Sequence, residues 1–187
     1  MIRPDRFPEL TTPRLDLRAP QLRDASDLFE VFRDPEVMRY WSSPPMQSVA
    51  DGEALVTRNL GYNSDGSGYG WVIERREDAR VIGTLALFHF SEQNNRAEIG
   101  YALGRAFWGA GYMHEALTAL IEFAFGDMDL RRLEADTDPR NAASIRALER
   151  LGFAREGLLR ERWLVAGEVC DTAFLGLLRS DWNARNA

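Results

Sequence analysis

The chain has 187 residues, of which 45% are hydrophobic and 28% are charged, and its formal net charge at pH 7 is −6. This length favours one domain, and the composition excludes a disordered or collagen-like chain. The negative charge argues against nucleic acid or an anionic membrane as a partner. One cysteine excludes an internal disulfide, and two histidines without a cysteine cluster predict no metal site. We expect a cytoplasmic protein, folded as a single domain over residues 1–187, that contacts no membrane.

Alternating apolar and charged side chains predict a first strand over residues 14–18. Apolar residues then recur at helical spacing up to Asp34-Pro35, and a second helical pattern runs over residues 49–60. Three apolar runs with short polar turns between them predict an antiparallel meander at residues 70–75, 81–88 and 97–103. Helices are expected at 112–125 and 139–151, and strands at 130–136, 162–165 and 172–178. The predicted class is α/β (α+β), with a single mixed, mostly antiparallel sheet of about six to seven strands flanked by about four helices.

The most informative segment is a glycine-containing turn between the third strand of the meander and the next helix. Gly109 and Gly111 let the backbone approach a pyrophosphate closely, and the first N–H groups of the following helix attract an anion. The pattern therefore predicts a phosphate site. Two alternatives stay open: a tight turn with only a structural role, and a dinucleotide site in which Glu134 contacts a ribose. His114 stands where the dinucleotide motif has its third glycine, which argues against the second alternative.

A second helix start is predicted at Asp138-Pro139, because aspartate caps helices and proline suits the first helical position. Gly152 is a suitable stop, since glycine adopts the left-handed conformation readily. Asn141 and Ser144 are three residues apart and project from one face near the expected start, where they suit the amides and phosphates of a long polar cofactor. The alternative is that Asn141 only caps the helix and Ser144 is an exposed surface serine.

Together, these segments resemble the GNAT acetyltransferase superfamily, and in particular its branch with the ribosomal-protein-alanine N-acetyltransferases. The resemblance covers about residues 11–182 and implies the GNAT (acyl-CoA N-acyltransferase) fold. It is carried by Leu10-Thr11-Thr12-Pro13-Arg14-Leu15, Ala97-Glu98-Ile99-Gly100-Tyr101, Trp108-Gly109-Ala110-Gly111-Tyr112 with Glu115-Ala116, and Asn141-Ala142-Ala143-Ser144 with Leu151-Gly152-Phe153.

The resemblance implies acetyl-CoA (acetyl-coenzyme A) as the co-substrate and no metal. In the family, the pyrophosphate lies on the glycine turn and the pantetheine arm lies between two diverging strands. Two positions depart from the family pattern: Met113 is bulkier than the usual alanine, and Leu148 stands where many members have a tyrosine acid. By resemblance, the residues that contact acetyl-CoA are Leu103, Trp108, Gly109, Ala110, Gly111, Tyr112 and Met113, with Asn141 and Ser144 on the other side.

Acetyl transfer to an amine needs a neutral amine, a polarised thioester carbonyl and a proton for the leaving sulfur. Glu98 on the central strand is the candidate general base, acting directly or through water. The alternative is that Glu98 forms an ion pair, since Arg96 falls on the same strand face. Ser144 is the candidate general acid, because Leu148 cannot donate a proton.

Tyr40 and Trp41 are the candidate substrate-binding residues, because loops near the first two helices face the cleft in this family; alternatively, they are ordinary packing aromatics. The sequence thus predicts an N-acetyltransferase that moves an acetyl group from acetyl-CoA to a primary amine, of a protein N-terminus or a small molecule, by direct attack. The alternative is a coenzyme A-binding sensor or interaction module without catalysis, which the leucine at position 148 keeps open. Homodimers are common in the family, so a homodimer is also open.

Overall fold

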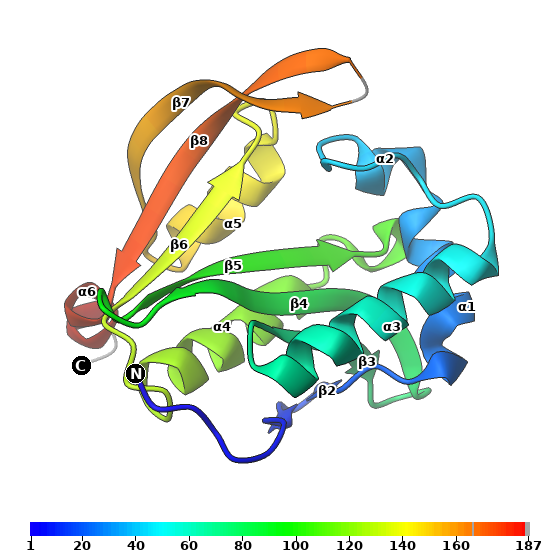
Figure 1. Cartoon of the computed structure of the whole chain (residues 1–187), viewed down its shortest axis with the longest axis horizontal. Coiled ribbons are helices and arrows are strands. Elements are labelled where there is room, and N and C mark those ends of the chain that lie inside the picture. The colour runs from blue at the N-terminus through cyan, green and yellow to red at the C-terminus, as the bar shows by residue number, and fades with distance from the viewer. Residues whose placement is uncertain (166, 186–187) are drawn as a thin grey trace.

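One open sheet of eight strands forms the centre of the molecule, in the order β1-β2-β3-β4-β5-β6-β8-β7 (Figure 1). The computed structural model describes residues 1–165 and 167–185; Ala166, Asn186 and Ala187 lie outside the described residues. Neighbouring strands are antiparallel except β5 and β6, which run parallel. The strands are β1 (Leu10–Thr11), β2 (Leu15–Arg18), β3 (Tyr69–Arg75), β4 (Arg80–Ser91), β5 (Arg96–Leu103), β6 (Arg132–Thr137), β7 (Ala154–Val165) and β8 (Glu168–Leu178).

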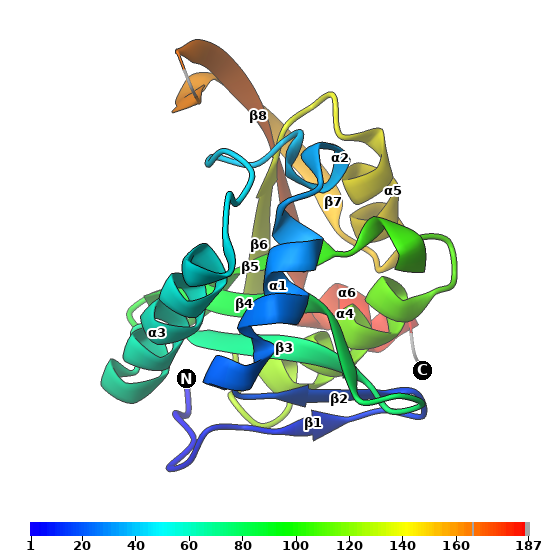
Figure 2. The same cartoon turned by 90° about the vertical axis from the view of Figure 1, so that its right-hand side faces the viewer.

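Helices cover both faces of the sheet, as Figure 2 shows for α1 and α3 on one side and α4 and α5 on the other. Trp71 and Val72 are neighbours on β3 and point to opposite faces. Trp71 joins the larger buried cluster with α4, and Val72 joins a smaller cluster with α1 and α3. The helices are α1 (Ala25–Phe32), α2 (Pro35–Met38), α3 (Val49–Asp65), α4 (Tyr112–Phe125), α5 (Ala142–Arg150) and α6 (Arg179–Arg185), with 3₁₀ turns at Leu22–Asp24 and Arg105–Phe107.

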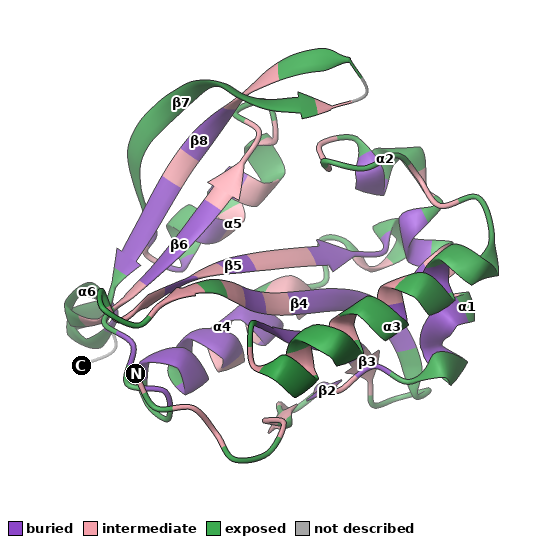
Figure 3. Ribbon diagram, viewed as in Figure 1, coloured by how far each residue is buried: buried purple, intermediate pink, exposed green. Residues whose placement is uncertain are grey.

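The predicted mixed, mostly antiparallel sheet is confirmed, and so is the meander of β3, β4 and β5. The sheet has more strands than the predicted six to seven, and the described residues form six helices instead of about four. β1 has two residues and α2 has four, so neither is long enough to show a periodic pattern. Figure 3 shows why β7 was predicted only in part: its residues are exposed over nearly the whole strand, so no alternation marks it.

The start of α5 differs from the prediction by three residues. The helix begins at Ala142, and the side-chain oxygen of Asn141 accepts a hydrogen bond from the backbone N–H of Ser144 at 3.1 Å. Asp138 does not cap this helix; its Oδ1 accepts from the backbone N–H of Arg140 in the turn before it, and its carboxylate also binds the Arg140 side chain. The predicted stop is confirmed, since Gly152 has a φ of 97° in the left-handed region.

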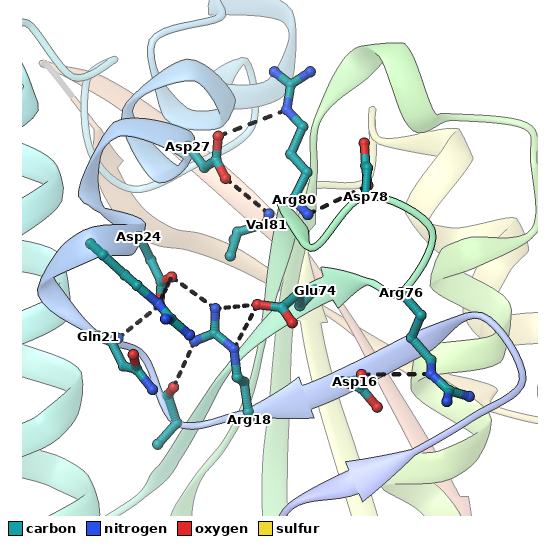
Figure 4. Close-up of polar contacts among 12 residues, drawn as sticks. Asp16, Arg18, Gln21, Asp24, Asp27, Glu74, Arg76, Asp78, Arg80 and Val81 are labelled. Atoms are coloured by element: carbon teal, nitrogen blue, oxygen red, sulfur yellow. Dashed lines mark hydrogen bonds and ion pairs between the residues drawn. The ribbon is translucent and has the colours of Figure 1, made fainter.

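A buried ion-pair network attaches the first helical segment to the sheet (Figure 4). Arg18 on β2 donates hydrogen bonds to both carboxylate oxygens of Asp24, each at 2.8 Å, and also pairs with Glu74 on β3. Asp24 is only 3% exposed, and its hydrogen bonds with Arg18 raise the pKa of the guanidinium above its ordinary value. Asp27 accepts a hydrogen bond from the backbone N–H of Val81 at 3.0 Å. These contacts fix the start of α1 relative to β2, β3 and β4.

Candidate functional site

The sheet opens between its two parallel strands. β5 pairs with β6 only over Arg96–Glu98 and Arg132–Glu134, although β5 continues to Leu103 and β6 to Thr137. Figure 1 shows the two strands diverging beyond this point. The facing edges of both strands beyond the paired residues are therefore available to a ligand that lies between them.

The glycine turn joins the end of β5 to α4 and exposes a row of backbone donors. Gly109 and Gly111 have φ angles of 76° and 81°, a region that glycine adopts without the clash of a Cβ atom. The backbone N–H groups from Gly109 to His114 donate no hydrogen bond to any other residue in the described part of the chain. They lie at the N-terminus of a helix of 14 residues, where the helix dipole places partial positive charge. The turn thus fits an anion such as a pyrophosphate.

The carboxylate of Glu115 anchors this turn to the N-terminal segment of the chain. It accepts hydrogen bonds from the Thr12 hydroxyl at 2.6 Å and from the backbone N–H of Arg14 at 2.9 Å. Burial raises the pKa of Glu115, but the hydrogen bonds from Thr12 and Arg14 outweigh it, and the net pKa is below the ordinary value. The guanidinium of Arg14 also donates to the Ala110 carbonyl at 2.9 Å and lies over the Tyr112 ring. The segment Thr12 to Arg14 therefore holds the turn in place.

The other residues predicted around the turn have structural contacts of their own. The indole N–H of Trp108 donates to the Leu103 carbonyl at 2.7 Å, and the ring is half exposed. The Leu103 side chain is buried. Met113 packs against the hydrophobic core. The bulk of Met113 is therefore directed into the core.

A cavity of about 330 Å³ lies beside the opening between β5 and β6. It brings together five of the predicted residues, from three separate parts of the chain: Tyr40, Trp41, Glu98, Asn141 and Ser144. Leu103 and residues 108–113 do not line it. The predicted residues therefore form two groups, a cavity group and a turn group, at different points along the same diverging strand.

Glu98 lines this cavity and is partly buried, with 21% of its side chain exposed. Its predicted alternative partner was Arg96, but Arg96 pairs with Glu134 instead. The partner of Glu98 is His89 on β4, whose Nδ1 atom lies 3.0 Å from Glu98 Oε2. The predicted ion pair between Glu98 and Arg96 is therefore wrong, and the Glu98 carboxylate faces an imidazole.

Ser144 in the first turn of α5 contacts a tyrosine on β5. The hydroxyl oxygens of Ser144 and Tyr101 are 2.7 Å apart, within one hydrogen bond. Burial raises the pKa of Tyr101 to about 12, so its phenol stays protonated and can donate. Asn141 caps the helix, as the alternative interpretation expected, while Leu148 is buried at 1% exposure and also lines the cavity. A phenol therefore reaches Ser144 from the strand.

Tyr40 and Trp41 form the wall of the cavity that comes from the loop after α2. Trp41 packs its ring edge-on against Phe32, with ring centroids 5.4 Å apart, so it is also a packing aromatic. The Tyr40 ring lies 5.4 Å from the guanidinium of Arg39 and 6.0 Å from that of Arg140. Both predicted residues therefore face the cavity and also have packing partners.

Several cavity residues were not singled out from the sequence. Asp136 near the end of β6 accepts hydrogen bonds from the Thr172 hydroxyl and, at 3.3 Å, from the indole N–H of Trp163. Across residues 1–165 and 167–185, no Lys or Arg forms an ion pair with Asp136. Arg140 lies 3.7 Å from the thiol of Cys170, which has no basic neighbour in the sequence. The sequence does contain one signal that could have identified Asp136. Glu134 and Asp136 are two residues apart on a strand, so both carboxylates lie on one face of the sheet.

Two further observations concern the described residues only. None of the helices within them is both long and apolar enough to cross a bilayer. Among the same residues, no group of three or more His, Cys, Asp or Glu is arranged to hold a metal ion.

The comparisons with known proteins identify the family. The family described as "Acetyltransferase (GNAT) domain" matches residues 14–154. The chain belongs to the GNAT family. An uncharacterized N-acetyltransferase of Bacillus licheniformis is 36% identical to this GNAT protein over 173 residues, which are 92% of this chain and 97% of the relative. The ribosomal protein uS5-alanine N-acetyltransferase of Escherichia coli strain K12 is 28% identical over 179 residues, 92% of each chain.

Solved structures agree with this assignment. The microcin C7 self-immunity acetyltransferase, solved with acetyl-CoA and AMP, has a TM-score of 0.80 and 21% sequence identity to this GNAT protein. The alignment covers 89% of this chain and 93% of that chain, and at this identity it shows the shared fold. The family match favours the acetyltransferase interpretation of the glycine turn over the dinucleotide alternative.

Proposed function

We propose that this GNAT acetyltransferase transfers an acetyl group from acetyl-CoA to a primary amine by direct attack. The observation that carries the proposal is the row of free N–H groups from Gly109 to His114, located where β5 and β6 diverge. The diphosphate of coenzyme A suits these donors, and the space between the strands suits its pantetheine arm. The acetyl-CoA bound in the microcin-immunity neighbour supports the same donor here.

The residues of the turn fit such a group without rearrangement. A Cβ atom built at Gly109 would meet no other atom within 4 Å, so the backbone there is open to an approaching phosphate. We assign contacts with acetyl-CoA to Leu103, Trp108, Gly109, Ala110, Gly111, Tyr112 and Met113, and on the other side to Asn141 and Ser144. The indole of Trp108 already donates to the Leu103 carbonyl, which leaves one lone pair of that oxygen for a cofactor amide.

Bound acetyl-CoA supplies a thioester whose carbonyl carbon is open to attack by the amine. Glu98 contributes the carboxylate of the base function, either directly or through a group that lies between it and the amine. Ser144 donates the proton that the departing sulfur requires. Tyr101 supports this role, because its phenol can donate to the Ser144 hydroxyl and leave the serine proton free to point into the cavity.

The acceptor binds in the cavity between Tyr40, Trp41 and the β7–β8 hairpin. Five carboxylates and two guanidinium groups line this cavity, which leaves an excess of three negative charges. A cationic amine therefore matches the wall better than an anionic substrate. The amines of protein N-termini belong to this class, and the similarity to the uS5-alanine enzyme supports them as a first choice. The carboxylates are Glu98, Asp136, Asp138, Glu168 and Asp171, and the guanidinium groups are those of Arg39 and Arg140.

A thiol-release assay tests the proposal. Purified protein is incubated with acetyl-CoA and each member of a panel of polyamines, amino sugars, amino acids and peptides with free N-termini, and the free thiol is measured. We expect saturable release that depends on one class of amine. Calorimetric binding of coenzyme A without turnover would instead favour the non-catalytic module, and no binding at all would overturn both. The single domain over residues 1–187, the cytoplasmic location and the homodimer stay predictions.

A further inference from the structure

His89 occupies an unusual backbone position on the edge of the cavity. It lies inside β4, where the pairing with β5 shifts register between Phe88 and Ser91. Its φ angle is 49°, in the left-handed region that few residues other than glycine adopt. A bulge of this kind re-aims a side chain, and such bulges are frequent next to active sites. The local backbone thus directs the His89 ring toward β5. In a regular strand the ring would follow the alternation of side chains between the two faces.

The bulge brings the His89 ring onto the carboxylate of Glu98. The Nδ1 atom lies 3.0 Å from Glu98 Oε2, and an ionised carboxylate only accepts, so Nδ1 carries the hydrogen. In the neutral imidazole this leaves the lone pair on Nε2. The Phe88 ring packs against the imidazole at a centroid distance of 4.7 Å and limits its rotation. The side chain is 70% exposed and lines the same cavity as Tyr40, so Nε2 is open to a ligand and to water.

We propose that His89 is the group that removes a proton from the acceptor amine, and that Glu98 acts through it as a positioning residue. This inference rests on the proposed acetyltransferase activity and deepens its base step. Nε2 takes one proton from the ammonium form of the amine, and the neutral nitrogen then forms the C–N bond as the C–S bond breaks. Ser144 gives its proton to the sulfur and is reprotonated by the second nitrogen proton, and His89 releases its proton to water.

The chemistry of the two side chains supports this division of roles. An imidazole ordinarily titrates between pH 5 and 8 and can hold a proton near neutrality, whereas an ordinary glutamate is a weak base with a pKa near 4.3. A carboxylate that accepts from Nδ1 fixes the tautomer and stabilises the imidazolium. Other charged groups line the same cavity as His89. They are Arg39 after α2, Asp136 on β6, Asp138 and Arg140 before α5, and Glu168 and Asp171 on β8.

The first test observes the His89 ring directly by NMR and requires no turnover. The chain has two histidines, so His114→Gln leaves a single imidazole signal. We expect the Nδ1–H resonance of His89 to be visible in this variant and to be lost or strongly shifted when Glu98→Ala is added, because the acceptor of its hydrogen bond is removed. A resonance that Glu98→Ala does not change would show that the two side chains do not interact in solution, and would overturn the proposal.

The second test is kinetic and uses variants that tolerate the left-handed backbone. His89→Gly and His89→Asn are expected to lower kcat/KM at pH 7 about 100-fold, with a loss that shrinks as the pH approaches the pKa of the amine. Added imidazole should restore much of the rate of His89→Gly but not that of His89→Asn. Glu122→Gln, a change at an exposed residue of α4 that belongs to neither the turn nor the cavity, is the control and should retain the wild-type rate. Circular dichroism confirms that each variant is folded.

The outcomes separate this inference from the proposed function. If the wild-type protein acetylates no amine, the proposed function fails and the role of His89 fails with it. If the wild-type protein is active and both His89 variants keep rates within twofold, only the role of His89 is overturned. If Glu98→Gln is far slower than His89→Asn, then Glu98 is the direct base, and the order of the two residues proposed here is wrong.

Discussion

The three hydrogen bonds to Glu115 provide a prediction whose size follows from the geometry. Oε1 accepts from the Thr12 hydroxyl and from the Arg14 backbone N–H, and Oε2 accepts from Arg14 Nε at 2.6 Å. Glu115→Ala leaves all three donors without this acceptor. Glu115→Gln keeps the oxygen at Oε1 but places an amide donor opposite Arg14 Nε. The two substitutions therefore remove different parts of the same contact.

Hydrogen bonds to charged groups contribute about 1.5–3 kcal/mol each, but neighbouring bonds are not additive and the partly exposed Arg14 can bind water instead. We expect the free energy of unfolding to fall by about 3 kcal/mol for Glu115→Ala and by about 1–2 kcal/mol for Glu115→Gln. Urea unfolding at pH 7 measures both. The control is Glu122→Gln, an exposed glutamate on the same helix, which should stay within about 0.5 kcal/mol of wild type. A Glu115→Ala protein as stable as that control would refute the reasoning.

Four further predictions follow from the same structure. The lowered pKa of Glu115 stabilises the folded state at pH values above the ordinary glutamate pKa of about 4.3. This contribution is lost as the pH falls through the lower pKa of the folded state. Urea unfolding measured against pH should show this loss of stability in wild type and not in Glu115→Gln. Gly109→Ala forces alanine to a φ of 76°, so the free energy of unfolding should fall by about 1 kcal/mol. The affinity for coenzyme A, measured by calorimetry, should fall at least about tenfold. Tyr101→Phe should lower kcat about tenfold with little change in KM for acetyl-CoA, and adding it to Ser144→Ala should have no further effect in steady-state assays. Asp24→Ala breaks a buried ion pair and should lower the unfolding free energy by about 3 kcal/mol in urea.

Much of the fold could be predicted because its elements carry local signals. The bounds of α4, Tyr112–Phe125, agree with the prediction, since the glycine turn before it and the apolar face within it mark both ends. The meander strands were identified because one or both faces are buried and short polar turns separate them. The end of α5 at Gly152 depends on one residue in the left-handed conformation, and a glycine in the sequence indicates such a position.

The remaining features depend on contacts that a local pattern does not contain. Asn141 and Asp138 are both good capping residues, and the sequence does not distinguish them: Asp138 accepts a backbone N–H in the turn at Arg140, and the helix begins after Asn141. The contact between His89 and Glu98 needs a strand bulge, and neither residue type predicts one. Asp136 meets the Thr172 hydroxyl only because β8 lies beside β6, and the two residues are 36 positions apart in the sequence. These are the features that shape the candidate site.

The leucine at position 148 was the reason to consider a binding module without catalysis, and the structure weakens that reason. The hydroxyl of Tyr101 reaches Ser144 from β5, so a phenol still serves the side of the cavity where the family tyrosine would act. Cavity and turn residues also form separate groups, so substitutions in the turn should change the affinity for coenzyme A, and substitutions at Tyr40, Trp41 or Glu98 in the cavity should change the reaction of the amine. The proposed transfer also gives a use to the acidic cavity and to the contact between His89 and Glu98, because a cationic amine would bind and react there.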